Sequence, residues 1–107
     1  MLLSDILTPE RTLCNLPGVS KKRFLTTISE HIAGTTNALS ADSIYTALLA
    51  REQLGSTGIG NGIAIPHCRV TECKTITGTL VKLEEGIDFD AVDSQQVDLL
   101  FVLIVPA

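Results

Sequence analysis

The 107-residue chain has few basic residues, three cysteines and no long apolar run, and each scarcity excludes a class of protein. Eight lysines and arginines against twelve acidic residues leave a net charge of −4, which argues against a general nucleic-acid binder. Cys14, Cys68 and Cys73 form an odd set without the spacing of a disulfide framework. The longest apolar run, Leu99–Val105, is far too short to cross a membrane as a helix.

The start of the chain carries no secretory signal, because Ser4 and Asp5 interrupt the first apolar residues. Without an export signal, the cysteines are expected to stay reduced in a cytoplasm. The composition, 45% hydrophobic and 19% charged, is typical of a globular protein. The length predicts one domain, residues 1–107, with its own core.

Two helices are predicted in the first half. The first begins after the N-cap Ser20 and ends near Gly34, and the second begins after Ser40 and ends at Gly55. Arg51 falls in the last turns of the second helix. The buried faces are predicted from apolar residues at helical spacing: Phe24, Leu25, Ile28 and Ile32, then Ile44, Ala47, Leu48 and either Leu54 or its neighbours.

Strands are predicted where apolar or β-branched residues cluster. They are Arg11–Leu16 at an edge, Gly62–Pro66, Thr75–Leu83, Ile87–Val92 after a turn at Glu84–Gly86, and Val97–Val105 after a polar turn. The last strand is expected to be buried on both faces, which requires helices on both sides of the sheet. The predicted fold is therefore α/β, with a mixed sheet flanked by helices on both faces. Since only two helices precede that strand, either the chain is a fragment or a covering layer comes from elsewhere.

The strongest functional signal is Leu54–Val70, with the sequence LGSTGIGNGIAIPHCRV. Its glycines have no Cβ, so backbone N–H groups there can approach an anion closely. His67 follows at once, at a strand end stiffened by Pro66, and imidazole is a nucleophile near neutral pH. This combination favours a phosphate-handling site.

Other interpretations of the same segment are weaker. The loop lacks the lysine of the nucleotide-binding G-x-x-x-x-G-K-[ST] pattern and precedes a strand. A zinc site from His67, Cys68 and Cys73 has no evident fourth ligand, and neighbouring residues of a strand point to opposite faces. We therefore expect no metal and no cofactor. The plainest alternative is a tight turn after a helix, followed by a surface histidine.

The block GSTGIGNGIAIPH resembles the type-2 EIIA domains of the bacterial phosphoenolpyruvate-dependent phosphotransferase system (PTS), and most of all their nitrogen-regulatory branch. The preceding ALLAREQL and the later FDAVDSQQVDLLFVLIVPA extend the resemblance over essentially the whole chain. The resemblance implies the mannitol-type EIIA fold.

The resemblance also implies a role for named residues. His67 would accept a phosphoryl group from an HPr-like phosphocarrier, called NPr in this branch, and Arg51 would neutralise phosphoryl oxygens. The phosphate-binding loop would consist of Gly55, Ser56, Thr57, Gly58, Gly60 and Asn61.

In the nitrogen branch, the phosphorylation state is read by regulatory targets such as potassium-transport or sensor-kinase proteins. Sugar-specific relatives instead pass the group to an EIIB domain. A binding module whose partners ignore phosphorylation is a further alternative.

The sequence departs from the family pattern at its end. Family members continue past the VPA segment with helices that carry a second histidine near the first, whereas this sequence stops at Ala107. We therefore expect the C-terminal third of the EIIA domain to be missing here. Cys68 stands where many relatives have glycine, which we interpret as tolerated variation.

Overall fold

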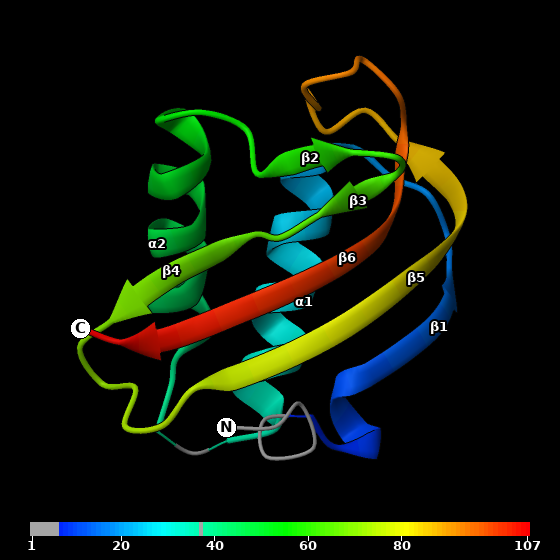
Figure 1. The fold of residues 1–107 in the computed structure, drawn as a ribbon. Coiled ribbons are helices and arrows are strands. Elements are labelled where there is room, and N and C mark those ends of the chain that lie inside the picture. Colours follow the sequence, from blue (N-terminus) through cyan, green and yellow to red (C-terminus); the bar gives the residue numbers. More distant parts are fainter. Residues whose placement is uncertain (1–6, 37) are drawn as a thin grey trace.

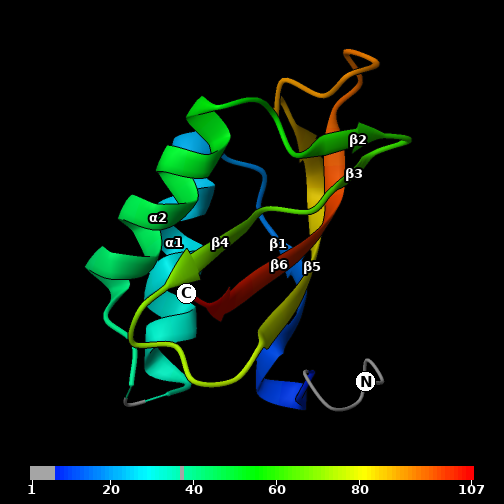
Figure 2. The same cartoon turned by 60° about the vertical axis from the view of Figure 1, so that its left-hand side comes forward.

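In the computed structural model, which describes residues 7–36 and 38–107, a mixed sheet carries two helices on one of its faces (Figures 1 and 2). The first six residues lie outside the described residues, so the predicted absence of a secretory signal concerns a segment that the structure does not describe. The elements are a 3-10 turn Pro9–Arg11, β1 Thr12–Leu16, α1 Lys21–Gly34, α2 Ala41–Gln53, β2 Gly58–Gly60, β3 Ile63–Ala64, β4 His67–Val70, β5 Thr77–Ile87 and β6 Val97–Pro106. Across the described part of the chain, no helix is long and apolar enough to span a membrane.

Both predicted helix starts are confirmed. The Ser20 hydroxyl accepts the backbone N–H of Arg23 at 3.2 Å, and the Ser40 hydroxyl accepts that of Ser43 at 3.1 Å. Each bond satisfies an N–H group that has no partner within its own helix. The predicted burial of Leu54 is wrong, because α2 ends one residue earlier and leaves this side chain 84% exposed.

The sheet has the order β1-β5-β6-β3-β2, and β4 also pairs with β6. The strand predicted as Gly62–Pro66 is in fact interrupted: β3 and β4 lie one after the other along the same edge of β6, both parallel to it. Pro66 has no N–H to donate to a ladder, although its carbonyl still accepts the N–H of Leu103 at 2.9 Å. His67 therefore begins a strand, where the sequence had predicted that it follows one.

Part of the glycine-rich segment is a β-hairpin rather than a loop. β2 pairs antiparallel with β3, and the residues between them, Asn61 and Gly62, both have positive φ angles of 58° and 78°. Asn-Gly favours this kind of two-residue hairpin turn. β2 was missed because glycine, at two of its three positions, has no strand propensity.

The predicted turn at Glu84–Gly86 and the strand Ile87–Val92 are wrong. β5 continues through these residues to Ile87, with a shift of register against β6. Gly86 permits this because a Cβ there would lie 2.8 Å from the Cβ of Gln96. The apolar residues after β5 belong to a loop, from which Phe89 enters the core and meets the Phe24 ring edge-on at 6.3 Å.

The core lies between the sheet and the two helices. From β6 it receives Leu100, Val102 and Ile104, which are fully buried and alternate along the strand with half-buried residues. Within residues 7–36 and 38–107, α1 and α2 lie on the same face of the sheet, so these helices cover one face of the last strand (Figure 2). The expected α/β architecture is confirmed. The mixed sheet itself is confirmed.

Candidate functional site

The structure brings Arg51 and His67 together, sixteen residues apart in sequence. Arg51 is in the last turn of α2, and His67 is the first residue of β4, which packs beside that helix. The Arg51 Nε lies 3.4 Å from the His67 Nε2, a long hydrogen bond between partly exposed side chains. This pair was predicted to form the centre of the site.

The ring of His67 is oriented by the backbone. Its Nδ1 lies 2.8 Å from the carbonyl oxygen of Ile65. Because a carbonyl only accepts hydrogen bonds, Nδ1 carries the proton in the neutral ring. The lone pair is then on Nε2, the nitrogen that faces Arg51. In this tautomer the imidazole presents its nucleophilic atom to the guanidinium group.

The guanidinium of Arg51 is held from a second direction. Its Nη1 donates to the carbonyl oxygen of Gly55 at 2.9 Å. Of its five N–H donors, three then have no partner within the described part of the chain. A planar group with free donors beside a nucleophile is suited to bind the oxygens of a phosphoryl group.

The predicted anion cradle is largely occupied by bonds within the protein. The Thr57 N–H and hydroxyl both donate to the Glu52 carboxylate, and the N–H of Gly58 donates to the Ser56 hydroxyl. That hydroxyl in turn donates to the carbonyl of Phe89 at 2.5 Å. These bonds stabilise the loop and occupy the donors of Thr57 and Gly58, whose binding of phosphate stays a prediction.

Gly60 and Asn61 lie away from His67. On β6, the partner of Ile63 is Leu99 and that of His67 is Leu103. Four strand residues span about 13 Å, and the hairpin turn lies beyond Ile63. The hairpin carries these two residues toward the far end of the edge, and their binding of phosphate stays a prediction.

The N–H of Asn61 is bound elsewhere. It donates to the carboxylate of Asp93 at 3.0 Å. This bond, together with that from the Gln95 N–H, lowers the pKa of Asp93. The hairpin turn is thereby attached to the loop before β6, not to the candidate site.

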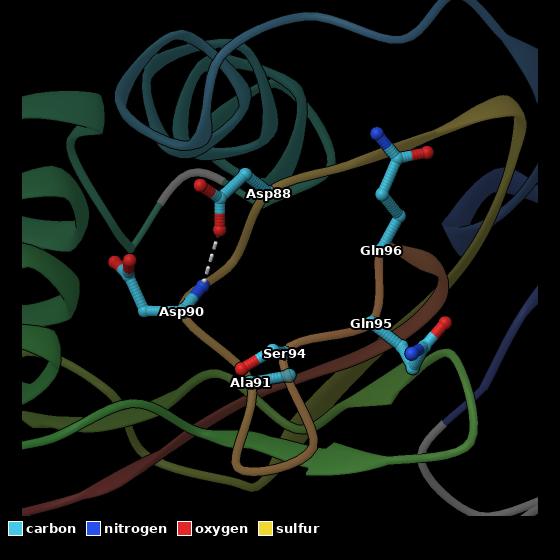
Figure 3. Close-up of a pocket in the computed structure, with 6 residues that line it drawn as sticks. All are labelled: Asp88, Asp90, Ala91, Ser94, Gln95 and Gln96. Atoms are coloured by element: carbon cyan, nitrogen blue, oxygen red, sulfur yellow. Dashed lines mark hydrogen bonds between the residues drawn. The ribbon is translucent and has the colours of Figure 1, made fainter.

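A cavity of about 550 Å³ lies in the loop between β5 and β6 (Figure 3). Asp88 and Asp90 line it, and the N–H of Asp90 donates to the Asp88 carboxylate at 3.0 Å. The other lining residues are small or uncharged: Ala91, Ser94, Gln95 and Gln96. Neither His67 nor Arg51 is among the lining residues, and the Lys21 ammonium at 3.4 Å is already paired with the Asp90 carboxylate, so this cavity is not the predicted site.

The cysteines are not arranged with His67 as a metal centre. His67 is exposed, whereas its neighbour Cys68 is buried on the opposite face of β4. Burial, and secondarily the nearby Cys73, raises the pKa of the Cys68 thiol to about 12. A thiol that keeps its proton is a poor ligand and a poor nucleophile. Among the described residues, no group of three histidine, cysteine or acidic side chains is placed to hold a metal.

Sequence reasoning missed Glu52 and Lys21. The Glu52 side chain is only 3% exposed and forms an ion pair with Lys21 at 2.8 Å. The sequence does contain a signal for Glu52. An acidic residue in the last turn of a helix interacts unfavourably with the helix dipole, so a basic partner is expected nearby. The partner lies on the other helix, which the sequence does not identify.

Comparison with known proteins identifies relatives along nearly the whole chain. Residues 5–107 match the family described as EIIA 2 of the phosphoenolpyruvate-dependent sugar phosphotransferase system. The nitrogen regulatory protein of Pseudomonas aeruginosa is 52% identical over 104 residues, covering 97% of this chain and 68% of the relative. That of Escherichia coli is 49% identical over 106 residues, covering 98% and 64%. The chain thus spans about two thirds of the length of these curated relatives.

Solved structures give the same result. The nitrogen regulatory protein IIA-Ntr from Neisseria meningitidis superposes with a TM-score of 0.91 at 36% identity, covering 99% of this chain and 72% of that one. The IIA mannitol structure from Escherichia coli has a TM-score of 0.77 at 20% identity, covering 94% and 72%. At that identity, the second likeness shows the fold alone.

Proposed function

Since the chain belongs to the EIIA 2 family of the phosphoenolpyruvate-dependent sugar phosphotransferase system, and its relatives include nitrogen regulatory proteins, we propose that His67 accepts and carries a phosphoryl group. Members of this family are phosphotransferase components. One observation supports the proposal most directly. The Nδ1 of His67 is hydrogen-bonded to the carbonyl oxygen of Ile65, so the lone pair of Nε2 faces Arg51.

The proposed reaction follows from this tautomer. The Nε2 lone pair attacks the phosphorus of a phosphohistidine on the donor protein; the new N–P bond forms as the donor's N–P bond breaks, and the donor imidazole leaves. The transition state is loose, with negative charge on the equatorial oxygens. Arg51 gives up its long contact with Nε2 and turns its N–H donors toward those oxygens. The Ile65 carbonyl keeps the ring oriented throughout.

In this proposal the loop contributes less than the sequence predicted. Gly55 acts through its carbonyl, which holds Arg51. Ser56 is bound to the carbonyl of Phe89, and Thr57 is bound to Glu52. The phosphoryl oxygens are therefore bound mainly by Arg51.

The proposed donor is a small HPr-like phosphocarrier such as NPr, acting in the cytoplasm on residues 1–107 as a single EIIA type-2 domain. Proteins of this family act with phosphocarrier or EIIB partners; one fold neighbour is the IIA mannitol enzyme of Escherichia coli in complex with phosphorylated IIB mannitol. We further propose that partner proteins, such as potassium-transport or sensor-kinase proteins, respond to the phosphorylation state of His67.

The test uses the only two histidines of the chain. Wild type, His67→Ala and His31→Ala are incubated with phosphoenolpyruvate and a phosphorylated HPr-like donor, and phosphate is measured by intact mass. Wild type and His31→Ala should gain one acid-labile phosphate, and His67→Ala should gain none. Phosphate on His67→Ala, or its absence from the wild type, would contradict the proposal.

A further inference from the structure

A buried network of polar groups leads from α1 to the edge of the candidate site. At its centre is the Glu52 carboxylate, which receives the Lys21 Nζ at 2.8 Å, the Thr57 N–H at 3.2 Å and the Thr57 hydroxyl. Both carboxylate oxygens are thus bound inside the protein. Glu52 cannot act on the phosphoryl group, because its side chain is 3% exposed and carries a negative charge.

Helix stability does not explain this glutamate. It stands in the last turn of α2, where a negative charge opposes the helix dipole. Its burial costs free energy, since the carboxylate and the Lys21 ammonium both lose water. An apolar residue of similar volume would avoid both costs, so the network has a role other than stabilising α2.

The network fixes the carbonyl that holds Arg51. Glu52 binds the 55–57 segment at both ends: its carbonyl accepts the Gly55 N–H at 3.2 Å, and its carboxylate accepts Thr57. Between these two bonds lies the Gly55 carbonyl, which accepts the Arg51 Nη1 at 2.9 Å. The same guanidinium places its Nε 3.4 Å from the His67 Nε2.

Lys21 attaches the network to a second loop. Its Nζ also donates to the Phe89 carbonyl at 3.4 Å and lies 4.6 Å from the centre of the Phe89 ring. The Ser56 hydroxyl donates to that same carbonyl. The 55–57 segment is therefore bound by Glu52 of α2 and by the Phe89 carbonyl of the loop before β6, and Lys21 of α1 binds both of these partners. These bonds restrict the position of the Gly55 carbonyl.

We propose that Glu52 is a positioning residue for phosphoryl transfer: with Lys21 and Thr57 it fixes the Gly55 carbonyl, and through that carbonyl it holds Arg51 beside His67. This inference rests on the proposed function for its kinetic consequence. Its structural consequence, the placement of Arg51, can be measured without any donor.

The kinetic test compares Glu52→Gln, Thr57→Val and Thr57→Ser. Thr57→Val removes the hydroxyl that binds Glu52, whereas Thr57→Ser retains it. The single-turnover rate from a phosphorylated donor should fall on the order of tenfold in Glu52→Gln and Thr57→Val. Thr57→Ser should recover most of the wild-type rate. The donor concentration at half-maximal rate should stay unchanged, because donor docking does not use these buried groups.

A double-mutant cycle separates positioning from a general structural role. If Thr57 and Glu52 act through Arg51, Thr57→Val in an Arg51→Ala background should cause no further loss. An equal further loss would overturn the inference. Thermal melts identify any variant that does not fold; if Glu52→Gln fails to fold, the Thr57→Val and Thr57→Ser pair decides the outcome.

The structural test needs no donor protein. Long-range ¹H–¹⁵N spectra at one pH report the ring nitrogens of His67, which should shift in Thr57→Val and not in Thr57→Ser. Unchanged His67 resonances in a folded Thr57→Val variant would overturn the inference. Phosphorylation of His67→Ala would instead contradict the proposed function, so the two failures are distinguishable.

Discussion

Replacement of Arg51 by alanine tests the chemistry proposed for the site most directly. The guanidinium makes two contacts, to the Gly55 carbonyl at 2.9 Å and to the His67 Nε2 at 3.4 Å. Alanine removes the positive charge from beside the nucleophile and leaves the backbone of α2 undisturbed. The phosphoryl oxygens then lose the side chain proposed to stabilise their charge in the transition state.

The size of the effect follows from the exposure of the pair. Two unit charges about 4 Å apart interact by about 1 kcal/mol in water and about 4 kcal/mol at the effective dielectric constant near a protein surface. His67 is exposed and Arg51 half-buried, and a docked donor excludes further water. A loss of about 2.7 kcal/mol, or a hundredfold in rate, is therefore expected. Arg51→Lys retains the charge without the planar fork and should lose about tenfold.

The assay is single-turnover transfer from a saturating phosphorylated donor, quenched and resolved by phosphate-affinity electrophoresis. Arg23→Ala is the matched control, because it removes the same charge from an exposed side chain on α1. It should transfer at the wild-type rate. If Arg51→Ala also transfers at that rate while His67→Ala accepts no phosphate, Arg51 has no role in charge stabilisation.

Two further predictions concern the core. Thr79 is fully buried and its hydroxyl has no hydrogen-bond partner among the described residues, so Thr79→Val should stabilise the fold by about 1 kcal/mol. A melting temperature that does not rise by about 4–8 °C would contradict this. Cys14 is exposed, whereas Cys68 and Cys73 are buried and burial raises the pKa of both thiols. At pH 8 a thiol reagent should modify one cysteine rapidly, and fast modification of Cys68 would refute its burial.

The same Cys68 shift predicts how stability depends on pH. Its pKa is raised in the folded chain, so its contribution is present below the ordinary thiol pKa of 9.0. The contribution of Cys68 to stability declines as the pH rises from 9.0 toward about 12, because in this range the thiol loses its proton in the unfolded chain but keeps it in the folded chain. The free energy of unfolding, measured by denaturant titration, should fall less between pH 8 and pH 10 in Cys68→Ala than in the wild type. Equal losses would contradict the assignment.

Local chemistry made much of the fold predictable. Ser20 and Ser40 cap the helices because a serine hydroxyl can accept the first free N–H groups of a helix. The apolar and β-branched residues of β6 favour a strand that packs one face against a core. Prediction failed where a strand depends on its neighbour. β2 consists largely of glycine, and β5 runs through the Glu84–Gly86 segment and pairs with β6 again at Ile87, after a shift of register.

For the site, the sequence by itself identified the proposed nucleophile. Pro66 and His67 are adjacent, and the family block around them is continuous in the chain. Only the tertiary structure decided which groups surround that histidine. The parallel pairing of β4 with β6 beside α2 brings Arg51 to the Nε2 of His67, and the packing of α1 on α2 joins Lys21 to Glu52. A sequence lists donors and acceptors, but hydrogen bonds form between groups that the packing of helices and strands brings within about 3 Å.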